Sequence, residues 1–260
     1  MPYIRATIAY DGTDFLGFQW QAGGRTIQSA IETALGQVAQ EAVRVVGSGR
    51  TDSGVHARGQ VIGFNTAWRH SLADLQRALN AVLDPDVAVL ELHLAPPGWH
   101  PRFSALRRHY RYTVLNETLR SPLDRRYAYW VPEPLDLTAL RAASEFFVGE
   151  HDFASFGRPM PRRFEATGSG STVRRVFSAG WQQSGSWFTF DVVGNAYLRS
   201  MVRSLVGTLL EVGRGAWSVG RFVSVLTACN RALAAPPAPA CGLCLMRVDY
   251  DGQFYKEQQT

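Results

Sequence analysis

Two successive runs of alternating strands and amphipathic helices constrain the fold of this chain more than any other feature of its sequence. Alternation of apolar and polar residues predicts strands at residues 3–10, 43–47, 59–65, 87–94, 109–116, 172–182, 187–193 and 242–250. Apolar residues at helical spacing, preceded by capping residues, predict helices at 26–38, 71–83, 136–147 and 196–212, and a short one from Ser218. The second half therefore repeats the plan of the first.

The helix starts are marked by residues that cap the first turn. Thr26 precedes an apolar stripe of helical period, and Ser71 is followed three residues later by Asp74, which is the spacing of a capping box. The second helix is expected to turn Leu72, Leu75, Leu79 and Val82 inward. The long helix at 196–212 is expected to bury its own apolar stripe of Leu198, Met201, Val202, Leu205, Leu209 and Val212.

Strands and helices in this order predict an α+β fold with two similar lobes. Each lobe is expected to be a mixed, largely antiparallel sheet with helices on one face, with a cleft between the lobes. We place the boundary after residue 104, which gives an N-terminal lobe at 1–104 and a C-terminal lobe at 105–260.

Composition is that of a globular protein, since 46% of the 260 residues are hydrophobic and 19% are charged. No stretch approaches 18 apolar residues, and the N-terminal segment lacks the apolar centre of a signal peptide, so we expect a cytoplasmic protein with no membrane partner. Three cysteines favour reduced thiols over a disulfide framework. Cys241 and Cys244 have C-x-x-C spacing without a second pair, which argues against a zinc site.

The charge is basic and is carried by arginine. The net charge is +5, and among 27 basic residues only Lys256 is a lysine. Arginines gather at 102–112, between aromatic residues, and at 158–175, in a glycine- and serine-containing loop. The planar guanidinium binds phosphate with two parallel hydrogen bonds and stacks on bases, so these clusters favour a nucleic-acid partner over an acidic small molecule.

The segment GRTDSGVHARGQ, residues 49–60, raises the question of what Asp52 does between glycines. Its G-x-G-x-x-D start lacks the third glycine of a dinucleotide fingerprint, and no G-K-[ST] follows, so both nucleotide-binding motifs are excluded. Two readings stay open from these residues alone. Asp52 either closes a turn with its side chain, or is a reactive carboxylate held up by a tight loop.

Six blocks in order resemble the tRNA pseudouridine synthase A family. They are YDGTDFLGFQWQ, GRTDSGVHARGQV, RFSALRRHYRY, HDFASFG, GNAYLRSMVRSLVGTLLEVG and APACGLCLMRVDY, which together run from about Tyr3 to Tyr250. The resemblance implies the pseudouridine synthase fold and an enzyme that detaches uracil from ribose and rejoins it through carbon 5. This isomerisation needs no cofactor and no metal. His56, His100 and His151 likewise show no paired ligand spacing.

The resemblance also implies the catalytic residues. Asp52 is the nucleophile, Arg203 is the partner that favours its ionised form over the protonated form that burial favours, and Tyr110 stacks on the target uracil. Tyr112, on the same face of the strand, is expected in the core, and alternation places His109 and Arg111 on the opposite face. Ser53 stands where the family usually has alanine, and its hydroxyl is a candidate donor to the Asp52 carboxylate.

Further residues are expected to bind the substrate. Arg50 helps to extrude the target base or holds its phosphate, and Leu243 or Leu245 walls the uracil pocket. The arginines expected to bind RNA are Arg107, Arg108, Arg162, Arg163, Arg174 and Arg199.

The resemblance implies action on tRNA positions 38, 39 and 40 in the anticodon stem-loop by a homodimer. Two rival functions stay open. A non-catalytic RNA-binding protein or chaperone with this fold would not need Asp52. A nucleoside or glycoside hydrolase would need a second carboxylate near the motif, and the blocks contain no recurring one.

Overall fold

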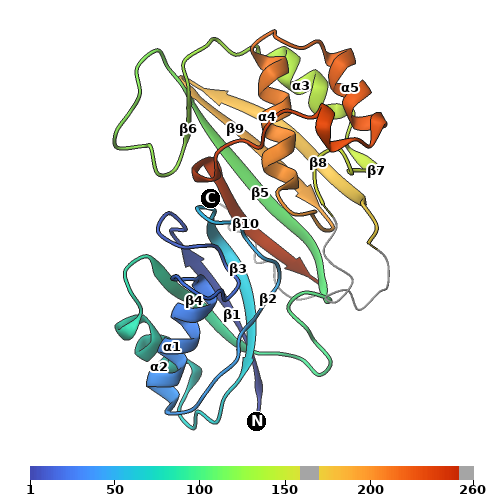
Figure 1. The fold of residues 1–260 in the computed structure, drawn as a ribbon. Helices are drawn as coiled ribbons and strands as arrows, with labels where there is room; N and C mark the ends of the chain where they lie inside the picture. Colours follow the sequence, from blue (N-terminus) through green and yellow to red (C-terminus); the bar gives the residue numbers. More distant parts are fainter. Residues whose placement is uncertain (159–169, 252–260) are drawn as a thin grey trace. The chain divides into compact units, whose positions relative to one another are not determined.

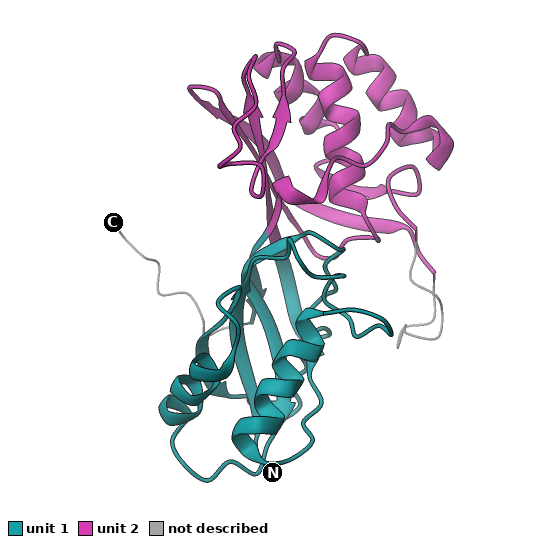
Figure 2. Ribbon diagram, turned by 60° about the vertical axis from the view of Figure 1, so that its left-hand side comes forward, with its two compact units in different colours: residues 1–108, 245–260 teal, residues 109–244 magenta. Residues whose placement is uncertain are grey.

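The computed structural model describes residues 1–158 and 170–251 (Figure 1). The chain forms two compact units (Figure 2): unit 1 holds residues 1–108 and the chain from Leu245 onward, and unit 2 holds residues 109–244. Two strands, β5 (Ala105–Asn116) and β10 (Leu243–Tyr250), have residues in both units. The predicted division into lobes at 1–104 and 105–260 stays a prediction.

Unit 1 is built on an antiparallel sheet. The strand β1 (Tyr3–Tyr10) pairs with β3 (His56–Asn65) on one side and with β4 (Val87–Leu94) on the other, so that Ile4 is opposite both Phe64 and Leu94. The two-residue strand β2 (Val46–Gly47) pairs with β3. The predicted strand at 43–47 is therefore shorter, because the Val45 amide donates to the Glu32 carboxylate at 3.0 Å instead of to a neighbouring strand.

Two helices, α1 (Ile27–Ala39) and α2 (Leu72–Val82), lie on one face of the unit 1 sheet (Figure 2). Their predicted caps are confirmed: the Thr26 hydroxyl accepts from the Ser29 amide, and the Ser71 hydroxyl accepts from the Asp74 amide. Leu75 and Leu79 are buried, as predicted. Val82 is 37% exposed, so its predicted inward position is wrong. It is the last residue of the helix, where the chain turns away towards Asp84 and Pro85.

Unit 2 has the strand order β5-β9-β8-β7. The strands β8 (Val173–Ser184), β9 (Trp187–Gly194) and β7 (Gly149–Asp152) pair antiparallel, and β6 (Tyr129–Val131) adds to β5 in parallel. The helices α3 (Leu137–Glu145), α4 (Met201–Gly213) and α5 (Val219–Ala228) gather on one face of this sheet (Figure 1). Between them lies a core of fully buried phenylalanines: Phe147, Phe153, Phe156, Phe190 and Phe222.

The α4 helix starts five residues later than predicted. Its cap, Ser200, has a left-handed backbone with φ of 59°, and the preceding Arg199 forms an isolated bridge with Arg158. Bridge formation keeps these residues out of the helix. The predicted apolar stripe of the helix is nevertheless buried at every position, from Leu198 to Val212.

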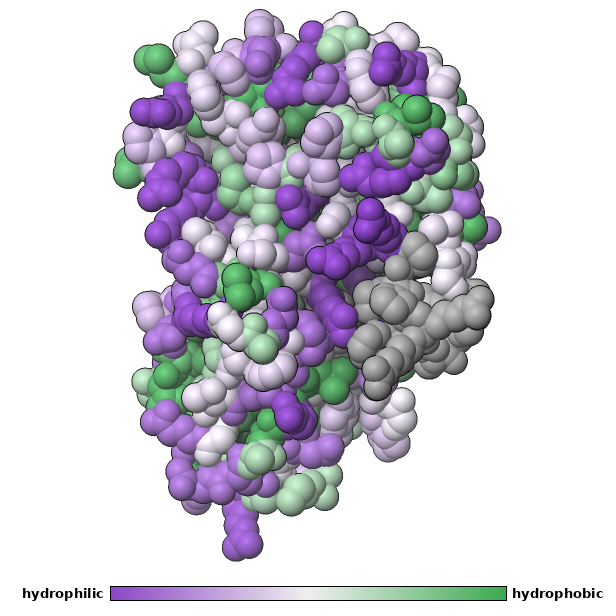
Figure 3. Space-filling model, viewed as in Figure 1, coloured by the Kyte–Doolittle hydropathy of each residue, from purple (hydrophilic) through white to green (hydrophobic). Residues whose placement is uncertain are grey.

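The surface of the protein is largely hydrophilic on the face drawn in Figure 3. On the face drawn in Figure 3, hydrophilic residues dominate both units and the apolar patches are small and separate. Among residues 1–158 and 170–251, no helix combines the length and apolar character needed to cross a membrane.

Candidate active site

Asp52 lies at the start of a tight turn that leads into β3. The Val55 amide donates to the Asp52 carbonyl at 3.2 Å, and Gly54 inside the turn has a left-handed φ of 76°. The residue is half-buried, between buried Thr51 and exposed Ser53. The structure thus confirms the sharp bend at this aspartate.

The early loop at residues 11–19 packs its backbone against the Asp52 turn. The Phe18 amide donates to the Thr51 carbonyl at 3.1 Å. A Cβ added at Gly17, which has a left-handed φ of 101°, would lie 2.8 Å from the same oxygen, and one added at Gly12 would lie 2.0 Å from the Val55 carbonyl oxygen. Only glycine permits this approach, so these two glycines fix the aspartate turn by direct backbone contact.

Ser53 has a different partner from the one its sequence position favours. Its hydroxyl donates to the Phe15 carbonyl at 2.9 Å. A hydroxyl carries one proton, so this bond is made in place of a donation to the Asp52 carboxylate. Ser53 therefore ties the turn to the early loop.

A buried polar network lies on both sides of Arg50 and Asp52. Gln60, with no exposed surface, donates to the Gly49 carbonyl at 3.0 Å and accepts from the Ser48 hydroxyl at 2.6 Å. The Tyr10 and Thr51 hydroxyls are 2.8 Å apart. The residues that flank the aspartate turn are thus held by satisfied buried hydrogen bonds, which specify one arrangement.

Arg50 is exposed, but a chain of amide side chains orients it. Its Nε donates to Gln19 Oε1 at 3.0 Å, Gln19 Nε2 donates to Gln28 Oε1 at 2.6 Å, and Gln28 Nε2 donates to Glu32 at 2.8 Å. Gln28 and Glu32 belong to α1. The helix therefore anchors the arginine that the sequence predicts to contact the substrate.

Tyr110 belongs to unit 2, where β5 presents it on the same face as Tyr112. Tyr110 is buried and meets Tyr197 edge-on, with ring centroids 5.2 Å apart at 89°. Tyr112 has no exposed surface, which confirms its predicted core position. Burial raises the pKa of the Tyr112 phenol well above its ordinary value, and the protonated hydroxyl donates to the Pro239 carbonyl at 2.8 Å.

The opposite face of β5 carries a charged cluster. His109 and Arg111 share this face, as predicted, and contact Asp191 at 2.7 and 2.9 Å. Burial acts to raise the pKa of Asp191, but the hydrogen bonds from His109 and Arg111 outweigh it and hold that pKa below its ordinary value. This cluster is a charge-compensated feature of the sheet.

Arg203 lies in the first turn of α4 and is half-buried. Its Nε donates to the Ala238 carbonyl at 2.8 Å, and the Ala238 amide donates to the Arg203 carbonyl at 2.9 Å. The proline-rich segment around Ala238 therefore positions the guanidinium. Nothing in the local pattern of that segment pointed to this role.

The predicted site residues are distributed over the two units. Asp52, Arg50 and Leu245 belong to unit 1, and Tyr110, Arg203 and Leu243 belong to unit 2. Leu243 and Leu245 are both buried and, two residues apart on β10, share one face of the strand.

The predicted RNA-binding arginines differ in exposure. Arg107 and Arg199 are exposed, and Arg174 is half-buried. The Arg174 Nη1 donates to the Ser171 and Val173 carbonyls at 2.8 and 2.6 Å. Arg162 and Arg163 lie outside the described residues. Arg108 is only 8% exposed, and its Nη2 donates to the Ser48 and Arg102 carbonyls, both at 3.0 Å. Its geometry favours a structural role over phosphate contact.

Several residues of the site carry no recognisable local signal. Three of them act through partners that are distant in sequence: Gln60 lies 50 positions from Tyr10, Tyr197 contacts Tyr110, and Ala238 contacts Arg203. Among the residues that the structure describes, no group of three or more histidine, cysteine, aspartate or glutamate side chains is arranged to hold a metal ion.

Comparison with known proteins identifies the family. Residues 6–104 and 143–251 match the tRNA pseudouridine synthase family. The chain is 45% identical over 254 residues to tRNA pseudouridine synthase A of Roseiflexus castenholzii, with 96% of this chain and 91% of the relative covered. It is 42% identical over 250 residues to the protein of the same name from Geobacter sulfurreducens, with 96% and 100% covered. With agreement over nearly its whole length, this chain belongs to the tRNA pseudouridine synthase family.

Proposed function

We propose that this chain modifies uridines at positions 38, 39 and 40 of the tRNA anticodon stem-loop, with Asp52 as the nucleophile. As a family member it is an isomerase that converts uridine to pseudouridine in tRNA. The bond between ribose carbon 1′ and uracil nitrogen 1 breaks, and a bond from carbon 1′ to carbon 5 forms. Carbon 5 loses a proton and nitrogen 1 gains one, so the reaction is balanced without an oxidant or reductant.

One observation carries the assignment of Asp52. Backbone contacts to the early loop hold its turn. The Phe18 amide donates to the Thr51 carbonyl at 3.1 Å, and the Gly12 backbone packs against the Val55 carbonyl. The half-buried carboxylate is thus presented on a rigid support. A nucleophile gains most from such support, because small displacements of a reacting group cost large factors in rate.

Tyr110 and Arg203, both in unit 2, have the proposed roles of stacking on the target uracil and of favouring the ionised nucleophile. The edge-on contact with Tyr197 fixes the Tyr110 ring, which suits stacking on a flat pyrimidine. The Ala238 carbonyl fixes one side of the Arg203 guanidinium. A positively charged guanidinium favours the ionised form of a carboxylate, which is the role proposed for Arg203. Leu243 or Leu245, both of which are buried, has the proposed role of the apolar wall of the uracil pocket.

Arg50 has the proposed role of extruding the target base. Arg50 is exposed and stands two residues before Asp52, and Gln19 and Gln28 hold its Nε in place. Removing a base from its stack costs a few kcal/mol, which an inserted arginine and a waiting aromatic ring offset.

The proposal includes a homodimer in the cytoplasm, with tRNA bound through exposed arginines such as Arg107 and Arg199. Phosphate contacts of this kind predict affinity that falls steeply with salt. Selection of the target then depends on RNA shape and on which bases can be splayed out.

The decisive experiment is tritium release from carbon 5 of labelled uridine in tRNA. The native chain and the control Glu91→Gln, which changes an exposed carboxylate on β4 of unit 1, outside the early loop, should release tritium. Asp52→Asn should still bind tRNA and release none. Equal release by Asp52→Asn would overturn the nucleophile assignment, and free uracil among the products of the native chain would support the hydrolase instead.

A further inference from the structure

We infer that Phe103 is a stacking platform for an unpaired base of the RNA substrate, an inference that rests on the proposed function. The ring lies in the turn of residues 100–104 that leads from β4 into β5. Phe103 is 57% exposed, although Pro101, two residues earlier, is buried.

His100 holds the Phe103 ring in place. The two rings are stacked, with centroids 4.4 Å apart at 29°. His100 Nδ1 accepts from the Arg102 amide at 3.1 Å and from the Phe103 amide at 3.3 Å, and the Ser104 hydroxyl accepts from the His100 amide at 3.0 Å. One face of the phenyl ring is thus covered by imidazole in a hydrogen-bonded turn, and the exposed surface belongs to the rest of the ring.

The turn is fixed to the loop of the proposed nucleophile. A single nitrogen, Arg108 Nη2, donates to the Arg102 carbonyl in this turn and to the Ser48 carbonyl, both at 3.0 Å. Ser48 stands four residues before Asp52. From the other side, the Tyr250 hydroxyl donates to the Pro101 carbonyl at 2.7 Å. Phe103 is therefore displayed by the unit that carries Asp52, on a support joined to the same loop.

The charge around the ring fits nucleic acid. The Arg102 guanidinium lies 5.7 Å from the Phe103 centroid, Arg107 is exposed, and residues 100–108 contain no acidic side chain. Exposed aromatic rings flanked by arginine bind single-stranded RNA, because each base offers a flat face while the cations meet the phosphates. An anticodon loop supplies unpaired bases.

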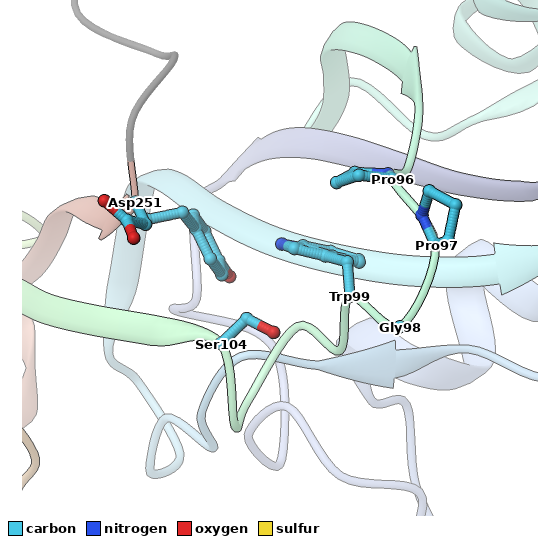
Figure 4. A pocket seen from close by; sticks show the side chains of 7 residues that line it. Pro96, Pro97, Gly98, Trp99, Ser104 and Asp251 are labelled. Carbon is cyan, nitrogen blue, oxygen red and sulfur yellow. The ribbon is translucent and has the colours of Figure 1, made fainter.

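A cavity next to the segment between β4 and β5 is a less suitable site for a base (Figure 4). It has a volume of about 250 Å³ and is lined by Pro96, Pro97, Gly98, Trp99, Ser104, Tyr250 and Asp251. The Asp251 carboxylate at its edge repels phosphate. The base is therefore assigned to the Phe103 ring and not to this cavity.

The test compares RNA affinity at one fixed salt concentration, by fluorescence anisotropy with an anticodon stem-loop RNA. Phe103→Ala should weaken binding about 5- to 150-fold, the equivalent of ~1–3 kcal/mol per stacked base. Phe103→Tyr keeps a ring and should bind nearly as the native chain does. The matched control is Phe146→Ala, which removes a 49% exposed phenylalanine at the end of α3. It should leave affinity unchanged.

The dependence of RNA affinity on salt concentration distinguishes base stacking from arginine–phosphate contacts. Phe103→Ala should keep the native slope of affinity against salt, whereas Arg107→Ala should reduce that slope by about one. Circular dichroism checks folding. If the alanine variant is unfolded, Phe103→Leu replaces it in the binding experiment, because leucine keeps the apolar volume but has no aromatic face. This variant should also bind RNA weakly.

Two outcomes would overturn the platform. One is native affinity in Phe103→Ala or Phe103→Leu. The other is a change in oligomeric state, measured by sedimentation, that accounts for the lost affinity and makes a second copy of the chain the partner of Phe103. Tritium release by the native chain on the same RNA keeps the two proposals apart: its absence counts against the proposed function, whatever Phe103 does.

Discussion

The two units hold their proposed catalytic groups in different ways. In unit 1, the Asp52 turn is fixed by backbone groups, with Phe18 on Thr51 and Gly12 against Val55 at a distance that admits no side chain. In unit 2, Tyr110 and Arg203 are fixed through side chains, by the Tyr197 ring and by the Ala238 carbonyl. The comparison teaches that backbone contacts support the proposed nucleophile, whereas side-chain contacts, which tolerate graded change, support the residues proposed to assist it.

The largest effect should come from adding one methyl group under the aspartate turn. Gly12→Ala would place a Cβ 2.0 Å from the Val55 carbonyl oxygen, and neither backbone segment can yield locally. We expect loss of detectable tritium release and a fall of about 3 kcal/mol in the free energy of unfolding. Gly180→Ala is the control, since its Cβ would meet nothing within 4 Å. Native behaviour of Gly12→Ala would remove the claim of rigid backbone support.

The buried amide beneath the turn should matter next. Gln60→Ala leaves the Ser48 hydroxyl and the Gly49 carbonyl without their present partner, which should lower the free energy of unfolding by about 2 kcal/mol. Urea denaturation followed by circular dichroism measures it. Gln182→Ala, at an exposed glutamine of β8, should change stability little. Equal effects of the two substitutions would contradict the special role of the network.

The unit 2 site should respond in a graded way. Tyr197→Leu removes the ring edge that meets Tyr110, and we expect kcat to fall about tenfold, or ~1.4 kcal/mol, with KM little changed. Tyr197→Phe keeps the ring and removes the hydroxyl that donates to the Val192 carbonyl at 3.1 Å. It should stay close to the native rate. Identical kinetics for the leucine and phenylalanine variants would show that the ring contact does not position Tyr110.

The smallest expected effect is on the pH dependence of folding stability. Burial, together with the nearby Arg102 charge, lowers the pKa of His100 below its ordinary 6.5. The unfolded chain therefore takes up this proton first as pH falls. The stability that the neutral ring contributes is complete above about pH 6.5 and is lost as pH falls through the lowered pKa of the native state.

His100→Asn tests this assignment, because the asparagine oxygen can accept the same two amides without titrating. Unfolding midpoints measured across this pH range should fall less in the variant than in the native chain. Parallel curves for the two proteins would mean that His100 is not the titrating group.

Local patterns predicted much of the fold. Thr26 and Ser71 cap helices as predicted, because a cap is a contact between residues two or three positions apart. The helices predicted from Asp136 and Ser218 also begin there, and these two residues are their caps. The alternation along β5 predicted that Tyr112 is buried and that His109 and Arg111 share the other face. The start of α4 was missed because the bridge between Arg158 and Arg199 joins residues far apart in sequence.

The sequence by itself determined the elements, their caps and the sharp bend at Asp52, since each depends on neighbours along the chain. Only the tertiary structure decided between Arg107 and Arg108, adjacent arginines of which one is exposed and the other bonded to Ser48, 60 positions away. It likewise decided that the Ser53 hydroxyl donates to the Phe15 carbonyl, and that the Gln60 amide donates to the Gly49 carbonyl near the aspartate turn. Periodicity reports which face of an element is buried, whereas the identity of a distant partner depends on how separate segments approach each other.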